Sequence, residues 1–487
     1  MLSQQVLMLK KEDLSERIKH LPNNSEKINK MYSTYNRKKQ KVIIVLDDDP
    51  TGIQTIHDVN VYMDWSHEVL FEIFAKEDIV FIQTNSRSLT KQQTKDVHEE
   101  IMNNIVNASK KYNRDFTIIS RGDSTLRGHY PLETMVIKEA YEKLTNKKID
   151  AEILIPLFFE SGRVTYKDIH FIQEGEYFIP TNQTEFSKDA VFGYKNANLK
   201  NYIEEKTEGK YCSDDVVSIP LELLRNLEIE KITLILTNLK DFHKVIVNAL
   251  TYDDLKVFCI ALIRAEEMGK IFLYRTAASF VKTYGFIKDK SYLKKEDIDQ
   301  IAKVTKGQIL IIVGSYVNKT TQQLKRLLEC KKIHPIEINV KNILKNETEK
   351  EREVKSIVMA VERAMKDKKN PVIYTSRELV KDHSEDHSEN NLIISKTISD
   401  TLSEIVSSIE TKPFCIISKG GITSSDIATK ALGIRKGKVL GQILSSVPVI
   451  ISKKSKKWSN IPFVIFPGNV GDNNSLKDVY HILESKN

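Results

Sequence analysis

The sequence predicts an α/β protein of two three-layer domains, each built on a mostly parallel sheet. Three observations lead to this fold class. From Lys41 onward, short β-rich runs alternate with longer helical patterns, as in βαβ units. The chain has 487 residues, enough for two or three domains. A charged stretch without a strand signal, residues 287–300, divides the alternation into two sets.

The first set follows an N-terminal extension. Residues 1–40 read as a charged amphipathic helix and a basic linker, NRKKQK, that we expect to be solvated. The first domain is predicted over residues 41–290, with a polar helix at 90–112 between two of its strands. Its predicted strands are 42–46, 79–84, 116–120, 151–156, 232–237 and 270–274.

The second domain is predicted over residues 300–487. Within it, the polar segment 380–391 carries His383 and His387 at the i,i+4 spacing of a helical metal site. Because this segment is rich in Ser, Asp and Glu and has no apolar face, a surface loop is the better interpretation. The predicted strands of this domain are 308–316, 334–340, 371–376, 414–421 and 463–466.

Composition favours a cytoplasmic protein that binds small molecules. Hydrophobic residues make up 40% and charged residues 29%, and the net charge is +8, which suits an anionic ligand. No nucleic-acid-binding motif occurs, and no apolar run is long enough to cross a membrane. The four cysteines are scattered without a CxxC pair, as expected in a reducing cytosol, and the N-terminus is a poor signal peptide.

Three consecutive carboxylates, Asp47, Asp48 and Asp49, follow the apolar run VIIVL. Ligands of open α/β sheets bind at the carboxyl ends of strands, where these residues are expected. Pro50 and Gly52 predict a sharp turn directly after them. Adjacent carboxylates repel one another, so the cluster indicates a bound cation, a metal ion or a proton transfer. The alternative without chemistry is a turn capped by one aspartate.

A specific rival interpretation is a phosphatase of the haloacid-dehalogenase type. Asp47, Asp49 and Thr51 match its DxDxT start, in which the first aspartate is the nucleophile and the second an acid/base. Such enzymes also need an acidic pair at another strand end. The acidic pairs of this chain lie in helical or loop contexts: Asp214-Asp215 and Asp253-Asp254.

Polar residues also follow other predicted strands of the first domain. The run SRGDSTLRGHYPLET comes after the strand at 116–120 and leads into a helix that is expected near Pro131. Arginine offers a planar fork that suits a carboxylate. Arginines after successive strands, together with the first aspartates, indicate a pocket for a polyhydroxy carboxylate. The candidates are Asn85, Arg87, Asp123, Ser124, Thr125, Arg127, Gly128, Arg163 and Thr165.

The second domain gathers glycines after its strands, in the predicted loops 313–324, 418–432, 440–450 and 466–476. Gly420 and Gly421 precede Thr423 at an expected helix start, where backbone N–H groups bind anions. Several such loops in one domain favour nucleotide binding over chance turns. Neither a Walker sequence nor a GxGxxG is present.

On these residues, the chain resembles the four-carbon acid sugar kinases, once a family of unknown function, which phosphorylate threonate, erythronate and 3-oxo relatives with ATP. The first motif is Asp48-Asp49-Pro50-Thr51-Gly52, and the second, DSTLRG, runs from Asp123 to Gly128. The other matching positions are Gly314-Ser315, Lys419 to Thr423, Gly441, and Pro467 to Asp472. Asp47 stands where a small residue is commoner, residues Gln54 to Asp58 look like a longer subgroup, and residues 1–40 have no counterpart.

The resemblance implies an acid-sugar domain and an ATP domain that close over a ligand cleft between them. It implies ATP and Mg²⁺ as cofactors and Asp48 or Asp49 as the base, with the metal ligands unassigned. We expect no nucleic-acid or membrane partner and leave a homodimer open, and a non-catalytic sugar-acid-binding protein is the second alternative. Expected substrate contacts are Thr51, Gly52, Asn85, Arg87, Asp123, Ser124, Arg127, Gly128 and Arg163. Expected nucleotide contacts are Ser315, Gly420, Gly421, Thr423, Gly441, Gly468, Asn469, Val470 and Gly471.

Overall fold

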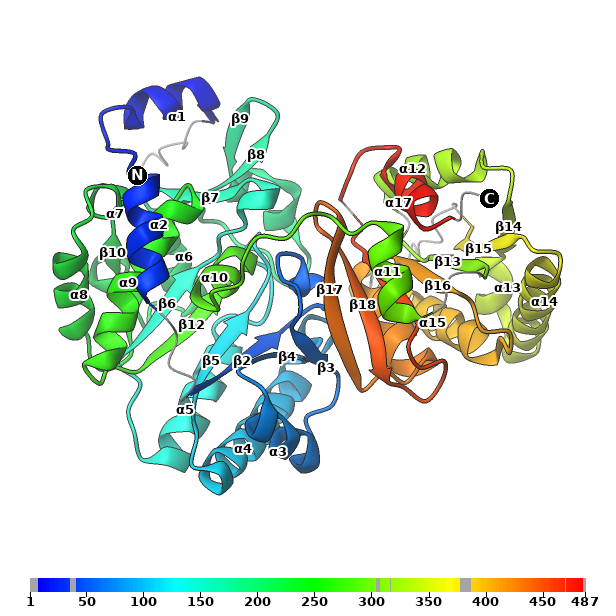
Figure 1. Ribbon diagram of the computed structural model, residues 1–487, viewed down its shortest axis with the longest axis horizontal. Coiled ribbons are helices and arrows are strands. Elements are labelled where there is room, and N and C mark those ends of the chain that lie inside the picture. Colours follow the sequence, from blue (N-terminus) through cyan, green and yellow to red (C-terminus); the bar gives the residue numbers. More distant parts are fainter. Residues whose placement is uncertain are drawn as a thin grey trace. The chain divides into compact units, whose positions relative to one another are not determined.

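The computed structural model describes residues 8–35, 41–303, 307–315, 317–376, 387–468 and 470–484. The chain forms two compact units (Figure 1). Unit 1 contains the residues up to Asp48 and Trp65–Lys288, and unit 2 contains Asp49–Asp64 and the residues from Asp289 onward. The chain therefore enters unit 2 at Asp49, returns to unit 1 at Trp65 and leaves it again after Lys288.

Unit 1 is built on a parallel sheet in which every neighbouring pair of strands has the same direction. The central strands are continuous apolar runs because helices cover both faces of such a sheet. Residues 42–46 of β2, for example, are all buried. The strand order is β10 (Val217–Ile219), β11 (His243–Val247), β6 (Ala151–Ile155), β12 (Phe272–Thr276), β5 (Asp115–Arg121), β2 (Lys41–Asp47) and β4 (Ile79–Gln83).

Helices of unit 1 begin and end where the sequence supplies caps. α4 starts with a capping box of Thr90 and Gln93 and ends at Asn113 in the left-handed conformation. The helices after the N-terminal extension are α3 (His67–Lys76), α4 (Lys91–Tyr112), α5 (Leu132–Thr145), α6 (Leu199–Lys206), α7 (Leu221–Arg225), α8 (Ile229–Thr237), α9 (Tyr252–Glu267) and α10 (Ala278–Tyr284).

One predicted strand of this unit is wrong. Residues 232–237 belong to helix α8, because the buried residues Ile229, Ile232 and Leu236 recur at helical spacing. Leu234, which would share a strand face with Ile232, is 61% exposed. The strand of this region is β11, which the sequence analysis missed.

The N-terminal extension packs on unit 1. Strand β1 (Leu9–Lys10) adds to a small antiparallel sheet, and α1 (Lys11–Ile18) contributes Leu14 to the core beneath it. α2 (Ser25–Thr34) packs against α9, where Asn29 accepts a hydrogen bond from Lys256. The small sheet has the order β1, β9 (Tyr177–Pro180), β8 (Ile169–Glu174) and β7 (Arg163–Tyr166).

Unit 2 has a mixed sheet. Five neighbouring strands are parallel, and three antiparallel strands continue the sheet on one side. Its order is β3 (Asn60–Tyr62), β17 (Lys436–Leu444), β18 (Val447–Lys454), β19 (Pro462–Phe466), β16 (Cys415–Lys419), β13 (Ile309–Val313), β15 (Asn370–Thr375) and β14 (Ile333–Ile338). The expected glycine loop at 440–450 is wrong, because these residues form most of the β17–β18 hairpin.

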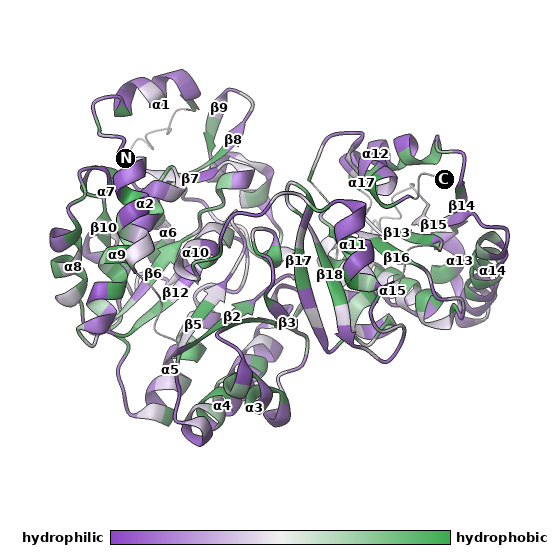
Figure 2. Cartoon of the chain, in the orientation of Figure 1, coloured by the Kyte–Doolittle hydropathy of each residue, from purple (hydrophilic) through white to green (hydrophobic). Residues whose placement is uncertain are grey.

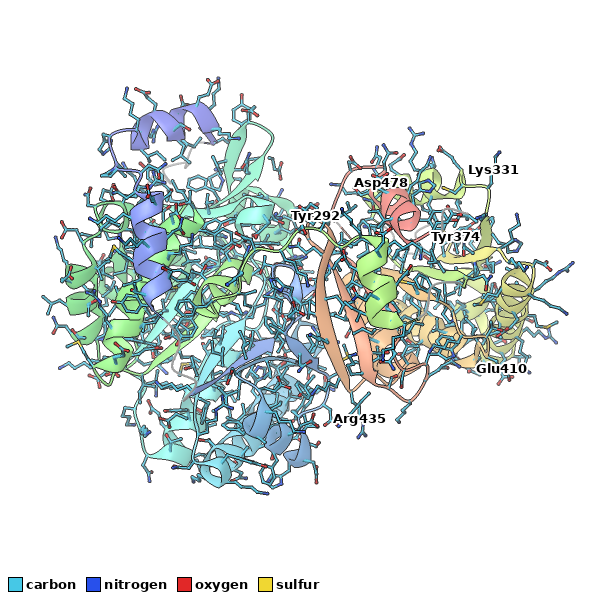
Figure 3. All side chains as sticks on the ribbon, viewed as in Figure 1. Tyr292, Lys331, Tyr374, Glu410, Arg435 and Asp478 are labelled. Carbon is cyan, nitrogen blue, oxygen red and sulfur yellow. The ribbon has the colours of Figure 1, made fainter. Side chains whose placement is uncertain are left out.

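Charged residues lie at the surface of unit 2, and Figure 3 labels Lys331, Glu410 and Asp478 as examples. Of the polar segment 380–391, residues 380–386 lie outside the described residues, and from His387 the chain is helical rather than a loop. The helices are α11 (Lys295–Ala302), α12 (Asn318–Leu328), α13 (Val340–Lys345), α14 (Glu347–Lys366), α15 (His387–Ser408), α16 (Gly421–Asp426) and α17 (Ser475–Leu483).

Apolar residues are concentrated in the strands of both units, whereas hydrophilic residues are frequent on the outer helices, notably α1, α4 and α14 (Figure 2). The core of unit 2 joins β13, β16, β18 and β19 to helices α12 and α17. Within the described parts of the chain, we find no helix with the length and apolar character needed to cross a membrane. The cysteines Cys212, Cys259, Cys330 and Cys415 form no disulfide.

Candidate active site

The three aspartates lie at the carboxyl end of β2, as predicted, but in different surroundings. Asp47 is fully buried and lies 3.4 Å from Arg121 Nη1. Asp48 is 2% exposed, while Asp49 is partly exposed and begins unit 2. A nucleophile must reach its substrate, so the burial of Asp47 does not favour the phosphatase interpretation.

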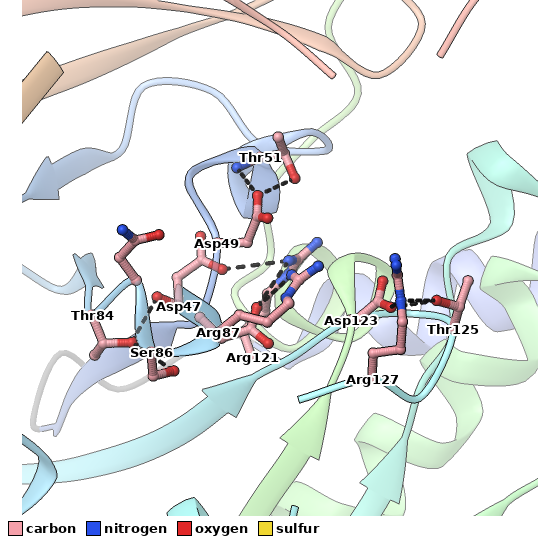
Figure 4. A network of polar contacts seen from close by, with 12 residues as sticks. Asp47, Asp49, Thr51, Thr84, Ser86, Arg87, Arg121, Asp123, Thr125 and Arg127 are labelled. Atoms are coloured by element: carbon pink, nitrogen blue, oxygen red, sulfur yellow. Dashed lines mark hydrogen bonds and ion pairs between the residues drawn. The ribbon is translucent and has the colours of Figure 1, made fainter. Parts of the chain in front are cut away.

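In unit 1, the Asp48 carboxylate lies against two arginines, Arg87 just after β4 and Arg121 at the end of β5, both labelled in Figure 4. Its Oδ1 accepts a hydrogen bond from Arg87 Nη2 at 2.9 Å and lies 4.0 Å from Arg121 Nη1. Its Oδ2 is buried and accepts no hydrogen bond from any described residue. Burial raises the pKa of Asp48 above its usual value, although Arg87 and Arg275 act in the opposite direction.

Arg275, at the end of β12, is a site residue that the sequence analysis missed. It is 5% exposed, forms an ion pair with Glu133 and donates to Ser120 Oγ at 2.9 Å. A Cβ at Gly122 or Gly128 would collide with its guanidinium group, so both glycines make room for it. Burial opposes ionisation of Glu133, but Arg275 outweighs it and lowers the pKa of Glu133 to about 2.

The DSTLRG motif forms a second charged group beside the first. Asp123 Oδ2 accepts a hydrogen bond from Arg127 Nε at 2.7 Å and another from Thr125 Oγ1. Burial opposes ionisation of Asp123, but Arg127 and Arg87 hold its pKa well below the usual value. Arg127 keeps a side-chain exposure of 25%, so part of its guanidinium group remains accessible.

A small pocket of unit 1 joins these two charged groups. Its lining includes both members of the Asp123–Arg127 pair and Arg275. Thr276 Oγ1 on this lining is buried and has no hydrogen-bond partner among the described residues. The lining residues are Asp123, Leu126, Arg127, Tyr130, Leu154, Pro156, Tyr202, Arg275 and Thr276.

Three other predicted substrate residues, Asn85, Ser124 and Arg163, lie outside the lining of this small pocket. Asn85 adopts the left-handed conformation and starts the short turn that carries Arg87. Ser124 is buried, and its carbonyl accepts a hydrogen bond from the ring of His170 at 2.8 Å. Arg163 begins β7 and donates to the Ser161 carbonyl, while its Nε has no described partner.

In unit 2, Asp49 caps the turn Pro50–Ile53, as the structural alternative predicted. Its Oδ1 accepts hydrogen bonds from Thr51 N at 2.7 Å and Thr51 Oγ1 at 2.5 Å, and Gly52 is buried in the same turn. This turn packs against α16, whose first residue is Gly421. A Cβ at Gly421 would lie 3.4 Å and 3.5 Å from the two carboxylate oxygens of Asp49.

The glycines after β13 and β16 come close together. A Cβ at Gly314 would clash with Thr423 Oγ1, and a Cβ at Gly420 would lie 3.3 Å from Ser315 Cβ. Gly420 also has a φ of +120°, a conformation that favours glycine. The two strand ends therefore approach closely enough to place Ser315 and Thr423 beside the Gly420–Gly421 turn.

The turn after β19 adjoins this group. A Cβ at Gly468 would lie 3.3 Å from Ser315 Oγ, and Thr320 Oγ1 donates to the Gly468 carbonyl at 3.3 Å. Val470 accepts a hydrogen bond from Gln323 at 3.0 Å. Gly471, with a φ of +82°, passes close to Ser475 at the start of α17. Asn469 lies outside the described residues.

Gly441 is placed differently from the other predicted nucleotide residues. It lies within β17 at an irregularity of the β17–β18 register. A Cβ there would contact Leu293 and Lys290 at 3.6–3.7 Å, not the glycine turns after β16 or β19. Its expected position in a strand-end loop is therefore wrong.

Two family models match the sequence. The model of a sugar-binding N-terminal domain matches residues 43–284, and that of a nucleotide-binding C-terminal domain matches residues 310–476. The first match contains Asp48, Asp123 and Arg127, and the second contains Ser315 and the glycine turns. No curated protein matches the chain significantly.

Solved structures share the fold of the chain. The Haemophilus influenzae protein HI1011, of the DUF1537 family, has a TM-score of 0.59 and 15% identity, covering 91% of this chain and 100% of that one. A Salmonella typhimurium LT2 protein, described as a proposed tRNA synthase, has a TM-score of 0.62 and 16% identity, covering 89% and 98%. At these identities the likeness concerns the fold.

Proposed function

The chain belongs to the family that joins a sugar-binding N-terminal domain to a nucleotide-binding C-terminal domain, and from this premise we propose that it is an ATP-dependent kinase of a small sugar acid. The enzyme transfers the terminal phosphoryl group of ATP to a hydroxyl group of the acid. The motif DSTLRG and the turn after β2 resemble those of four-carbon acid sugar kinases, which favours a four-carbon acid as the substrate.

The observation that carries this proposal is the position of Asp49 in unit 2. Its carboxylate lies against Gly421, in the turn where we place the nucleotide phosphates. A kinase needs a carboxylate near the transferred phosphoryl group, because the attacking hydroxyl loses its proton there. Of the two candidate bases, we assign this role to Asp49, since Asp48 is buried against Arg87.

The nucleotide side of the reaction is supported by the convergence of three strand ends. The glycines after β16 and β19 carry no Cβ where they approach Ser315 and Thr423, and backbone without side chains suits close approach of phosphate groups. We expect Mg²⁺ to arrive with ATP. No group of three or more described His, Cys, Asp or Glu residues could hold a metal by itself. Magnesium is commonly held by one or two carboxylates and the phosphates.

Unit 1 supports the acid side of the reaction. The pocket lined by Asp123, Arg127 and Arg275 has a volume of only about 10 Å³, so it does not hold the acid itself, but it brings together carboxylate and guanidinium groups of the kinds that bind hydroxyl and acid groups. Phosphoryl transfer requires little covalent chemistry from the protein, so positioning and charge stabilisation supply most of the rate.

The test is an ADP-release assay with ATP, Mg²⁺ and a panel of four-carbon aldonic and 3-oxo-aldonic acids, with five- and six-carbon acids for comparison. We expect ADP to form only with an acid of the panel, and mass spectrometry to show one added phosphoryl group on that acid. A protein that binds both ligands and releases no ADP would be a non-catalytic sugar-acid-binding protein. Hydrolysis of p-nitrophenyl phosphate without ATP would instead indicate the phosphatase.

A further inference from the structure

Lys419, at the end of β16, is a buried lysine held by backbone carbonyl groups. Its exposure is 0%, and its Nζ donates to the carbonyls of Pro467 and Gly468 at 2.6 Å and 3.1 Å. The Nζ also lies 4.1 Å from the centre of the Phe466 ring. Lys419 therefore joins the end of β16 to the turn after β19.

The positive charge of this lysine has no acidic partner in the described structure. No described carboxylate lies within ion-pair distance of Lys419, and the charged group that acts on it is Lys319 of α12. The turn after β19 offers it only carbonyls, one of which also accepts from Thr320. Burial, reinforced by Lys319, lowers the pKa of Lys419 to about 7.

The two carbonyls leave one donor of Lys419 unused. An ammonium group has three N–H donors, whereas an uncharged amine has two, so the amine form is enough to hold the turn. No described residue accepts the third hydrogen bond. Protonation of Lys419 would therefore add both a charge and a donor without breaking an existing contact.

The same contacts orient the turn after β19. A trans peptide places its C=O and N–H groups in opposite directions. Because the Pro467 carbonyl points at Lys419, the N–H of Gly468 points away from it. No described residue accepts a hydrogen bond from this N–H, and Gly468 lies beside Ser315. The turn thus presents a donor on the side away from Lys419.

We propose that Lys419 positions the phosphate-binding turn of unit 2 and supplies the buried positive charge that a nucleotide phosphate neutralises, so that nucleotide binding takes up a proton. This inference rests on the nucleotide binding that the proposed function requires. It assigns Lys419 as a positioning residue of the nucleotide site and couples the affinity for nucleotide to pH.

The first test measures proton uptake by the unaltered protein. Titration calorimetry of MgADP in buffers of different ionisation enthalpy gives the number of protons bound with the nucleotide. At pH 8 about nine tenths of Lys419 is uncharged when its pKa is about 7, so we expect an uptake of about 0.9 proton. At pH 6 we expect about 0.1, because the lysine is already charged.

Two variants separate the charge from the hydrogen bonds. We expect Lys419→Met to weaken MgADP binding about tenfold or more, because it removes both. Lys419→Gln retains amide donors for the turn, so it should bind more tightly than Lys419→Met while also taking up no proton. Lys430→Met, which removes a lysine paired with Asp400 and Asp426 in the same unit, serves as the control and should match the unaltered protein.

The outcomes distinguish this inference from the proposed function. Equal proton numbers at pH 8 and pH 6, or MgADP affinity within twofold in a folded Lys419→Met, would overturn the role of Lys419 and leave the kinase proposal standing. If Lys419→Met does not fold, the calorimetry of the unaltered protein still decides. Failure of the unaltered protein to bind MgADP at either pH would overturn the proposed function itself.

Discussion

Asp48 and Asp49 are adjacent in the chain, yet their carboxylates have different surroundings. Asp48 is buried in unit 1 against Arg87, and Asp49 is partly exposed in unit 2 against Gly421. Burial raises the pKa of Asp48 despite its arginine neighbours, so this carboxylate is costly to ionise. We therefore propose separate roles, in which Asp49 accepts the proton of the substrate hydroxyl and Asp48 fixes Arg87.

Asp49→Asn should lower kcat by about 10²–10⁴-fold, since the variant has the same shape and cannot accept the proton. MgATP binding, measured by calorimetry, should stay within a few fold of the unaltered protein. Asp48→Asn is the matched comparison and should affect the acid KM more than kcat. Near-normal kcat in Asp49→Asn would show that another group is the base.

Arg127→Ala should raise the KM for the sugar acid about tenfold or more and change the KM for ATP little, because Arg127 lies on the pocket of unit 1. Arg127→Lys retains the charge beside Asp123 without the planar fork, so its effect should be intermediate. Steady-state kinetics with each substrate varied in turn make the measurement. An equal rise of both KM values would contradict a role in binding the acid.

At the scale of elements, the sequence predicted the central strands well. Long apolar runs such as 42–46 and 309–313 can only be buried, and all their residues are buried in the two sheets. The run at 232–237 failed because a short apolar stretch fits a strand or a helix equally well. The helix is decided by its packing against α9, which the local pattern does not contain.

The helix α8 has a direct test. Ile232→Ala should lower the free energy of unfolding of unit 1 by about 2–5 kcal/mol, because it leaves a cavity in the core. Leu234→Ala, on the exposed side, should change it by less than about 0.5 kcal/mol. In a strand, both residues would lie on one face and both substitutions would be costly. Chemical denaturation followed by circular dichroism measures the difference.

The site was predictable where a residue follows an obvious strand, as with Asp123, Arg127 and Gly420. Arg275 carries the same signal, because it directly follows the strand predicted at 270–274, but it was overlooked; in the structure β12 continues to Thr276, two residues further. Lys419 was seen as part of a motif without a role, because its contacts come from a turn far along the chain. Long-range contacts of this kind leave no local pattern.

At the scale of the whole molecule, residues 49–64 belong to unit 2, although the predicted first domain ran without a break from 41 to 290. Strand β3 pairs with β17, with Tyr62 opposite Lys436. Asp58 reinforces this arm through Lys438 and Lys290, both at 3.1 Å. Unit 2 therefore includes a segment that, in the sequence, lies between the two stretches of unit 1.

A chain that begins at Asp289 should consequently self-associate. It lacks β3, so the β17 edge is unpaired and offers hydrogen-bonding groups to other molecules. We expect self-association in size-exclusion chromatography. The control joins residues 49–64 to Asp289 through a glycine-serine linker and should elute as the smaller species. Identical elution and melting of the two proteins would show that the arm contributes nothing to unit 2.

The same arm orders events during translation. Residues 60–62 leave the ribosome before most of unit 1 has been made, and their partner strand emerges only after residue 435. Domains generally fold from the N-terminus as they are synthesised, so unit 1 can fold before residues 49–64 have a partner strand to pair with. Unit 2, and with it the placement of Asp49 beside Gly421, is completed near the end of synthesis. A ribosome that stalls between the two strands would release a nascent chain with a folded unit 1 and no assembled unit 2.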